Sequence, residues 1–168
     1  MKKYISNIVM LAMVSIAFTA CGGDDDEDNN QSSGTGIGVH RIDVQFSGNT
    51  AECNALNIFY ALKADGSYAG LYESGKALQM DATTQTWHNE EFRPISIESE
   101  DGCGATAASI NVTSKTMRPI SSDLTVTVVG YVNGKRIKTQ VFTLPAGHTT
   151  MTGVFVTSDY ELHEEVTN

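Results

Sequence analysis

The dipeptide Asn133-Gly134 lies at the centre of an alternating stretch, residues 124–144, and is the strongest fold signal in the chain. Both central residues of a type I′ turn need a positive φ, which asparagine and glycine tolerate best. The dipeptide therefore predicts a β-hairpin. Simple pairing outward from the turn sets Val126 opposite Val141. Both faces of the hairpin hold apolar residues near its base, which is typical of strands central to a sandwich.

A second turn signal, Asp65-Gly66, predicts another two-residue hairpin, in which Leu62 pairs with Ala69. The preceding stretch, residues 54–64, alternates like a strand, although several of its apolar residues also fit one face of a helix. We interpret it as a strand.

The remaining expected strands are short alternating runs between turn residues, at 40–46, 92–98, 105–112 and 152–157. Seven or eight such strands without a long amphipathic helix predict an all-β fold. We expect an antiparallel β-sandwich, immunoglobulin-like or similar. A small lipocalin-like up-and-down β-barrel has a similar number of strands, so the strand count leaves this alternative open.

The first 21 residues have the composition of an export signal. Two lysines precede an apolar run, residues 5–17, which is shorter than the roughly 20 residues of a membrane-spanning helix. The run ends in Phe18-Thr19-Ala20-Cys21, which resembles the lipobox of bacterial lipoproteins, with Phe18 where leucine is usual. The resemblance implies that residues 1–20 are removed and that lipid on Cys21 holds the protein to a membrane. The alternative is an uncleaved anchor followed by a buried or disulfide-bonded Cys21.

An acidic run, Asp24-Asp25-Asp26-Glu27-Asp28, follows Cys21 almost directly. It resembles the signal that sends lipoproteins of Bacteroidetes-type bacteria to the outer leaflet of the outer membrane, which implies a cell-surface protein. The alternative is a solvated spacer at the periplasmic face, because blocks of like charge are usually disordered. Residues 21–38 hold almost no large apolar side chain and are expected to form a flexible tether.

Residues 39–168 are enough for one domain with a buried core. The whole chain carries a formal charge of −9, and loss of the two lysines in the export segment takes the mature chain to about −11 (−9 − 2). Nucleic-acid binding depends on lysines and arginines at phosphates. The acidic composition therefore argues against nucleic acid as a partner.

Three cysteines are present. If Cys21 carries lipid, Cys53 and Cys103 remain as a pair in an oxidising compartment. The sequence therefore predicts a disulfide between them, with two separate buried thiols as the alternative. Their spacing contains no CxxC motif and gives no support for a zinc or redox site.

The sequence contains no catalytic motif such as GxSxG or HExxH. Its four histidines are scattered, and an isolated histidine is more often structural or solvent-facing than catalytic; they are His40, His88, His148 and His163. The acidic stretch 98–101 is more typical of a solvated turn than of a calcium loop. We therefore expect a protein that is not an enzyme and that needs no cofactor or metal.

Trp87 lies in a polar stretch, residues 83–91, where packing alone does not obviously need an indole. Amphipathic rings are favoured at recognition surfaces, and exposed rings can stack on sugars. Trp87, Tyr68 and Tyr72 are therefore the candidate ligand-binding residues. The alternative is that Trp87 folds back onto the core.

These features predict a non-catalytic, lipid-anchored lipoprotein of the outer membrane that acts as a surface binding or accessory module. Its expected ligand is a glycan or another envelope protein. Two alternatives remain open. One is an adhesive or structural assembly subunit joined through edge strands. The other is a lipocalin-like carrier of a lipophilic small molecule.

Overall fold

A computed structural model describes residues 36–158. Within this range the chain forms ten β-strands and no helix, and so contains no helix that could cross a membrane. The predicted export segment 1–20, the lipidation site Cys21 and most of the predicted tether lie outside the described residues, as does the chain from residue 159 onward.

The strands follow one another as β1 (His40–Gly48), β2 (Cys53–Lys63), β3 (Leu71–Glu73), β4 (Lys76–Ala77), β5 (Trp87–Asn89), β6 (Ile95–Ser99), β7 (Cys103–Ser114), β8 (Leu124–Val132), β9 (Lys135–Leu144) and β10 (Thr150–Val156). The strands β3, β4 and β5 have only two or three residues each, which is too short for a recognisable alternation. The number of strands therefore exceeds the expected seven or eight.

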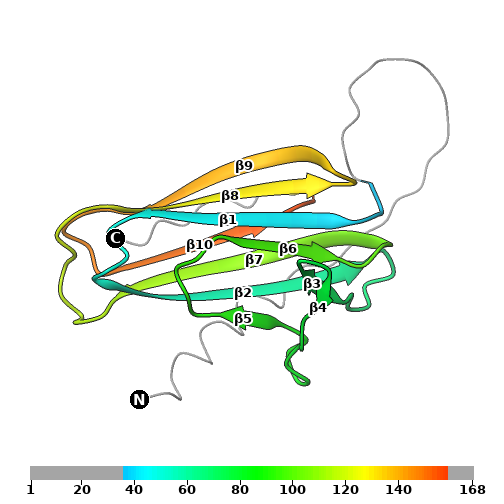
Figure 1. Cartoon of the computed structure of the whole chain (residues 1–168), viewed down its shortest axis with the longest axis horizontal. Helices are drawn as coiled ribbons and strands as arrows, with labels where there is room; N and C mark the ends of the chain where they lie inside the picture. Colours follow the sequence, from blue (N-terminus) through cyan, green and yellow to red (C-terminus); the bar gives the residue numbers. More distant parts are fainter. Residues whose placement is uncertain (1–35, 159–168) are drawn as a thin grey trace. The chain divides into compact units, whose positions relative to one another are not determined.

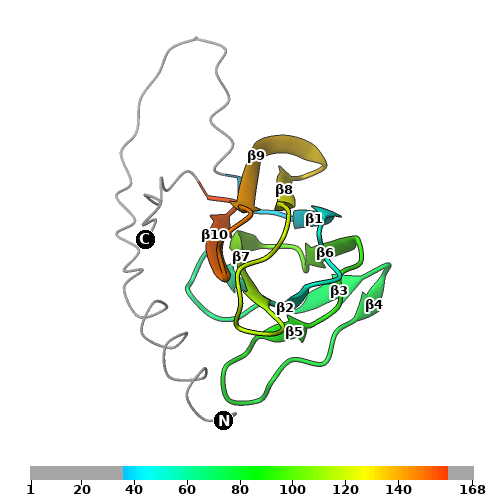
Figure 2. The ribbon, with the colours of Figure 1, turned by 90° about the vertical axis from the view of Figure 1, so that its left-hand side faces the viewer.

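Two antiparallel sheets stack face to face (Figures 1 and 2). The large sheet has the strand order β4-β3-β6-β1-β8-β9, and the small sheet has the order β10-β7-β2-β5. The predicted β-sandwich is confirmed. Because the sheets stay separate, the strands do not form the lipocalin-like barrel that was the alternative.

Strand alternation turns one face of each sheet into the core. In β1 the side chains of Ile42 and Val44 are fully buried, whereas Arg41 and Asp43 lie on the opposite face. Burying an aliphatic side chain contributes about 1.5–3 kcal/mol, so a one-residue slip of the strand would be costly. The largest buried side chains of the core are Phe59, Phe155, Ile42, Leu71, Ile95 and Ile97.

The hairpin predicted at Asn133-Gly134 is present, and both residues have positive φ, 50° and 77°. The predicted register is confirmed for the two pairs next to the turn, Val132–Lys135 and Tyr131–Arg136. Beyond them it is wrong, because a β-bulge lies between Tyr131–Arg136 and Gly130–Lys138. The extra residue shifts β9 by one position and pairs Val126 with Phe142 instead of Val141. The shift turns Phe142 into the core and leaves Val141 54% exposed, which satisfies the hydrophobic pattern of both strands.

The hairpin predicted at Asp65-Gly66 begins as expected but does not continue. Leu62 bridges Tyr68 rather than Ala69, so the predicted pairing is wrong. After Gly70 the chain crosses to the large sheet, where β3 pairs with β6. Leu71 is thereby fully buried between the sheets instead of lying beside β2.

Cys53 and Cys103 are both buried free thiols, so the predicted disulfide is wrong. Cys53 pairs with Ser114 at one end of the β2–β7 ladder, and Cys103 pairs with Lys63 at the other end. Ten residues of strand separate them, about 30 Å, whereas a disulfide needs Cα atoms about 4.4–6.8 Å apart. Burial raises the pKa of both thiols, which keeps them in the unreactive protonated form.

Two phenylalanine rings pack against glycines of the facing sheet. A Cβ atom added at Gly153 in β10 would lie 2.4 Å from the Phe142 ring of β9. A Cβ added at Gly130 in β8 would lie 2.8 Å from the Phe155 ring of β10. Each sheet thus supplies one ring and one glycine, and the two pairs close the sandwich on the β9–β10 side.

We expect the substitution Gly153→Ala to lower the free energy of unfolding by about 1–3 kcal/mol, because the added methyl overpacks the Phe142 contact. Urea denaturation measures the loss. Gly104→Ala in β7 of the same sheet is the matched control, since its Cβ would meet Ala64 at an ordinary 3.4 Å. Equal stability of the two variants would contradict a tight Phe142–Gly153 contact.

Candidate functional site

Trp87 does not share a surface with the two candidate tyrosines. It lies in β5, at the edge of the small sheet, and pairs with Phe59 of β2. Its ring turns inward with Phe59, the two ring centroids are 5.6 Å apart, and Trp87 is only partly exposed. The structure thus favours the alternative in which Trp87 packs on the core, and leaves Tyr68 and Tyr72 as candidates.

Tyr68 is 52% exposed in the connection between β2 and β3. Its neighbour is Tyr60, which lies on the outer face of β2 beside Ala105, Ala107 and Val156. Burial raises the pKa of Tyr60 above its usual value, and the nearby Tyr68 phenol raises it further. Tyr68 bridges Leu62, two residues along β2 from Tyr60, so both tyrosines lie on the outer face of the small sheet.

Tyr72 lies in β3 on the outer face of the large sheet, opposite Glu98 of β6. Its ring leans over Gly70: a Cβ added there would lie 3.6 Å from the Tyr72 hydroxyl and 3.6 Å from the Glu100 carboxylate. These are ordinary contact distances, so they show that Tyr72 and Glu100 both lie over Gly70.

An ion pair lies beside Tyr72 at this end of the sandwich. Lys63 Nζ at the end of β2 is 2.8 Å from Glu100 Oε1, which follows β6, and both side chains remain about one-third exposed. The hydrogen bond and charge of Glu100 raise the pKa of Lys63, and the bond from Lys63 lowers the pKa of Glu100. Both groups are charged at neutral pH and offer polar partners to a ligand.

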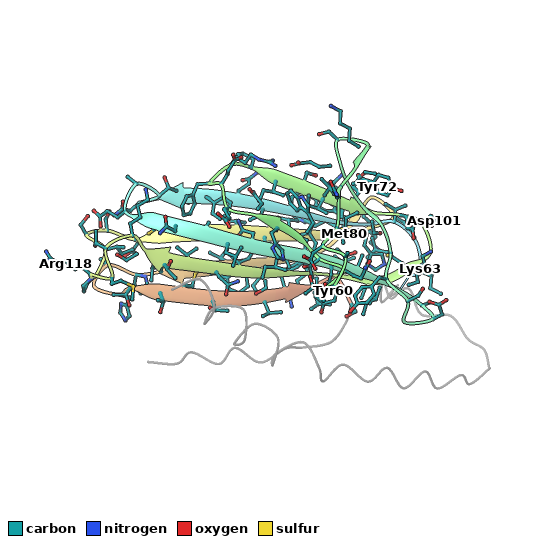
Figure 3. All side chains as sticks on the ribbon, turned by 90° about the horizontal axis from the view of Figure 1, so that it is seen from below. Tyr60, Lys63, Tyr72, Met80, Asp101 and Arg118 are labelled. Carbon is teal, nitrogen blue, oxygen red and sulfur yellow. The ribbon has the colours of Figure 1, made fainter. Side chains whose placement is uncertain are left out.

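We call this surface the tyrosine end; it comprises Tyr60, Tyr68, Tyr72, Lys63 and Glu100. Figure 3 shows Tyr60, Lys63 and Tyr72 toward one end of the sandwich, with Tyr60 and Tyr72 on opposite sides of it, and Arg118 at the other end. The arrangement can stack apolar faces of a ligand on rings and hydrogen-bond its polar groups to the ion pair. Sequence reasoning singled out two of the tyrosines. It missed Lys63 and Glu100, because nothing in a sequence links residues so far apart.

The acidic stretch 98–101 does not converge on one point. Glu98 lies on the outer face beside Arg41, Glu100 pairs with Lys63, and the Asp101 carboxylate accepts a bond from the Gly102 amide. Between residues 36 and 158, no group of three or more His, Cys, Asp or Glu side chains is arranged to hold a metal ion.

A buried histidine ties both ends of the described chain together beneath the tyrosine end. His40 is 1% exposed; its Nε2 atom donates to the Gly36 carbonyl at 3.0 Å, and its Nδ1 atom lies 2.6 Å from the Thr157 hydroxyl. The Thr106 amide donates to the same hydroxyl at 2.8 Å. With Nε2 protonated, Nδ1 accepts from Thr157, so the neutral ring is fully satisfied.

Burial lowers the pKa of His40 below its usual 6.5, and bonds to the backbone carbonyls of Gly36 and Cys103 offset part of this effect. The unfolded chain therefore binds a proton at a higher pH than the folded one. The stability due to neutral His40 is fully present above pH 6.5 and is lost as the pH falls from 6.5 toward the folded pKa.

We expect the free energy of unfolding to fall below about pH 6.5 with a slope of at most about 1.4 kcal/mol per pH unit from this group. The measurement is urea denaturation across pH for the wild type, His40→Gln and the control His88→Gln, whose ring is exposed. The slope should flatten only in His40→Gln. An NMR titration of the His40 ring gives the same answer if that variant does not fold, and an unshifted pKa would contradict the expectation.

No protein-family model matches the sequence, and no curated protein matches it. Solved structures do share its fold. A DUF4425 family protein from Bacteroides ovatus has a TM-score of 0.61 at 22% identity, over 75% of this chain and 100% of that one. A domain of unknown function, DUF4425, from Bacteroides vulgatus has a TM-score of 0.58 at 21% identity, over 74% and 97%.

A third structure is the calcium-bound form of a protein from Parabacteroides distasonis, with a TM-score of 0.51 at 15% identity, over 79% of this chain and 99% of that one. Two of the three neighbours are named DUF4425, a domain of unknown function. They share the sandwich with this chain and assign it no activity.

Proposed function

We propose that the protein is a non-catalytic lipoprotein, anchored by lipid on Cys21 at the outer face of the outer membrane, whose folded domain binds a ligand at the tyrosine end. The observation that carries the proposal is that three tyrosines lie toward one end of the sandwich, Tyr60 and Tyr68 on the small-sheet side and Tyr72 beside Glu100 of the ion pair on the large-sheet side, with Tyr68 52% exposed. An exposed ring surface with polar partners suits a glycan.

The anchor enters the fold at this same end. Gly38 exchanges backbone hydrogen bonds with Cys103, which pairs with Lys63, the cation of the tyrosine end. Fourteen residues lie between Cys21 and Gly36, and the length of their backbone limits the span to about 50 Å. A ligand held at the tyrosine end would therefore be within reach of the membrane surface, which favours a glycan or protein of the cell envelope.

The alternative of assembly through edge strands is less well supported. The long edge strand β9 carries Lys135, Arg136 and Lys138. Charged side chains, lysines above all, are a common device that prevents edge strands from pairing with other chains. We therefore favour a binding module over a polymerising subunit.

The lipid anchor predicts that Cys21→Ser moves the protein from the membrane fraction to the soluble fraction, because a serine hydroxyl cannot form the thioether. Cell fractionation, with metabolic labelling by a radioactive fatty acid, measures both location and lipidation. Cys53→Ser is the matched control and should stay labelled and membrane-bound. Retention of Cys21→Ser in the membrane would show that something other than this lipid holds the protein.

The tyrosine end predicts that Tyr68→Ala and Tyr72→Ala each weaken glycan binding by about 1 kcal/mol, roughly fivefold, through loss of ring stacking. A glycan array probed with the purified mature chain identifies the ligand, and calorimetry measures the affinities. Met117→Ala, 84% exposed on another loop, is the control and should bind as the wild type does. If the wild type binds no glycan, cross-linking in cells tests for a protein ligand instead.

A further inference from the structure

One row of side chains crosses the entire outer face of the large sheet. Residues that stand directly opposite each other on paired strands share a face of the sheet. The pairs Tyr72–Ala77, Tyr72–Glu98, Glu98–Arg41, Arg41–Tyr131 and Tyr131–Arg136 join end to end. The outer row therefore runs, strand by strand, through Ala77, Tyr72, Glu98, Arg41, Tyr131 and Arg136, from β4 to β9 (Figure 1).

Two tyrosines belong to the outer row. Tyr72, already part of the tyrosine end, and Tyr131 of β8 are both partly exposed. Three strand spacings separate their backbones, about 14 Å. A ligand that touches both rings must therefore be extended and several sugar rings long, and it would lie along a surface continuous with the tyrosine end.

The negative and positive side chains of the outer row lie in different halves of it. Glu98 lies next to Tyr72, whereas Arg41 and Arg136 flank Tyr131. The Arg41 guanidinium lies 3.9 Å from the centroid of the Tyr131 ring, and its Nε is 3.2 Å from Asp43. Arg136 is exposed and forms no ion pair with any residue between 36 and 158. The Tyr131 half of the row is thus the half that can receive a negative charge.

We propose that the outer row binds an acidic glycan, with a sugar carboxylate held by Arg136 beside Tyr131 and the neutral part of the chain extending over Glu98 to Tyr72. This rests on the proposed function and names its ligand class. An arginine guanidinium matches the geometry of a carboxylate and can bind it through two hydrogen bonds. Glu98 accepts hydrogen bonds from sugar hydroxyls.

The same charges argue against a lipid surface as the occupant. Glu98 and Asp43 both lie on this face, and each would repel a uniformly anionic layer of headgroups. A glycan avoids this repulsion because its carboxylates are separated by neutral hydroxyls. The row therefore fits a ligand with localised negative charge better than a continuous anionic surface.

The test measures binding of the purified mature chain to oligogalacturonate, hyaluronan oligosaccharides and sialyllactose, each compared with its carboxyl methyl ester. The ester keeps the sugar rings and removes the charge. At least one acid should bind, at least tenfold more tightly than its ester and less tightly in high salt. Arg136→Gln and Tyr131→Ala should lose roughly tenfold or more in affinity, whereas Arg118→Gln, an exposed arginine at the opposite end, should not.

The outcomes separate this inference from the proposed function. If neutral glycans bind in a Tyr68- and Tyr72-dependent way, while the acids bind no better than their esters or Arg136→Gln has no effect, the acidic-glycan inference is overturned and the glycan-binding function stands. If neither acidic nor neutral glycans bind, the acidic-glycan inference is overturned together with the glycan form of the proposed function, and only a protein ligand at the tyrosine end is left to test by cross-linking. Circular dichroism of each variant establishes that a loss of binding is not a loss of fold.

Discussion

Two phenylalanine–glycine contacts set the distance between the sheets along the β9–β10 side, and much of the domain depends on that distance. Phe142 rests on Gly153, and Phe155 rests on Gly130. No other residue type leaves room for a ring at that separation, so each contact requires a glycine on the facing strand. Thr157 follows Phe155 by two residues, and the position of β10 thereby brings its hydroxyl to His40. The position of β10 thus determines both the packing of the core and the His40–Thr157 hydrogen bond, which joins the two ends of the described chain.

The bulge in β9 connects this core to the outer surface. Close to the turn, pairing without the bulge places Arg136 beside Tyr131 on the outer face. Beyond the bulge, the shifted register turns Phe142 inward onto Gly153. A strand with a constant register could satisfy only one of these positions, because side chains alternate strictly between faces. The bulge therefore permits one strand to serve both the core and the outer row.

The errors of sequence reasoning share a physical cause. Alternation in β2 and β7 identified both strands correctly but gave no measure of where their ends lie relative to each other. Cys53 and Cys103 looked like a pair because two cysteines remained, yet they occupy opposite ends of one ladder. Trp87 was a candidate ligand-binding residue because its neighbours in sequence are polar, yet its cross-strand neighbour is the buried Phe59. In both cases the deciding contact came from a residue distant in sequence.

The sequence by itself determined the all-β class, the long strands and the hairpin at Asn133-Gly134, because alternation and turn chemistry are local properties of the chain. Only the tertiary structure decided which strands became neighbours. That choice buried His40 against Thr157, 117 residues away, and aligned Tyr72, Arg41 and Tyr131 in one row. Alternation fixes the face on which a side chain lies, but not the strand that lies beside it. Both candidate surfaces consist of such neighbours, so they became visible only in the folded sandwich.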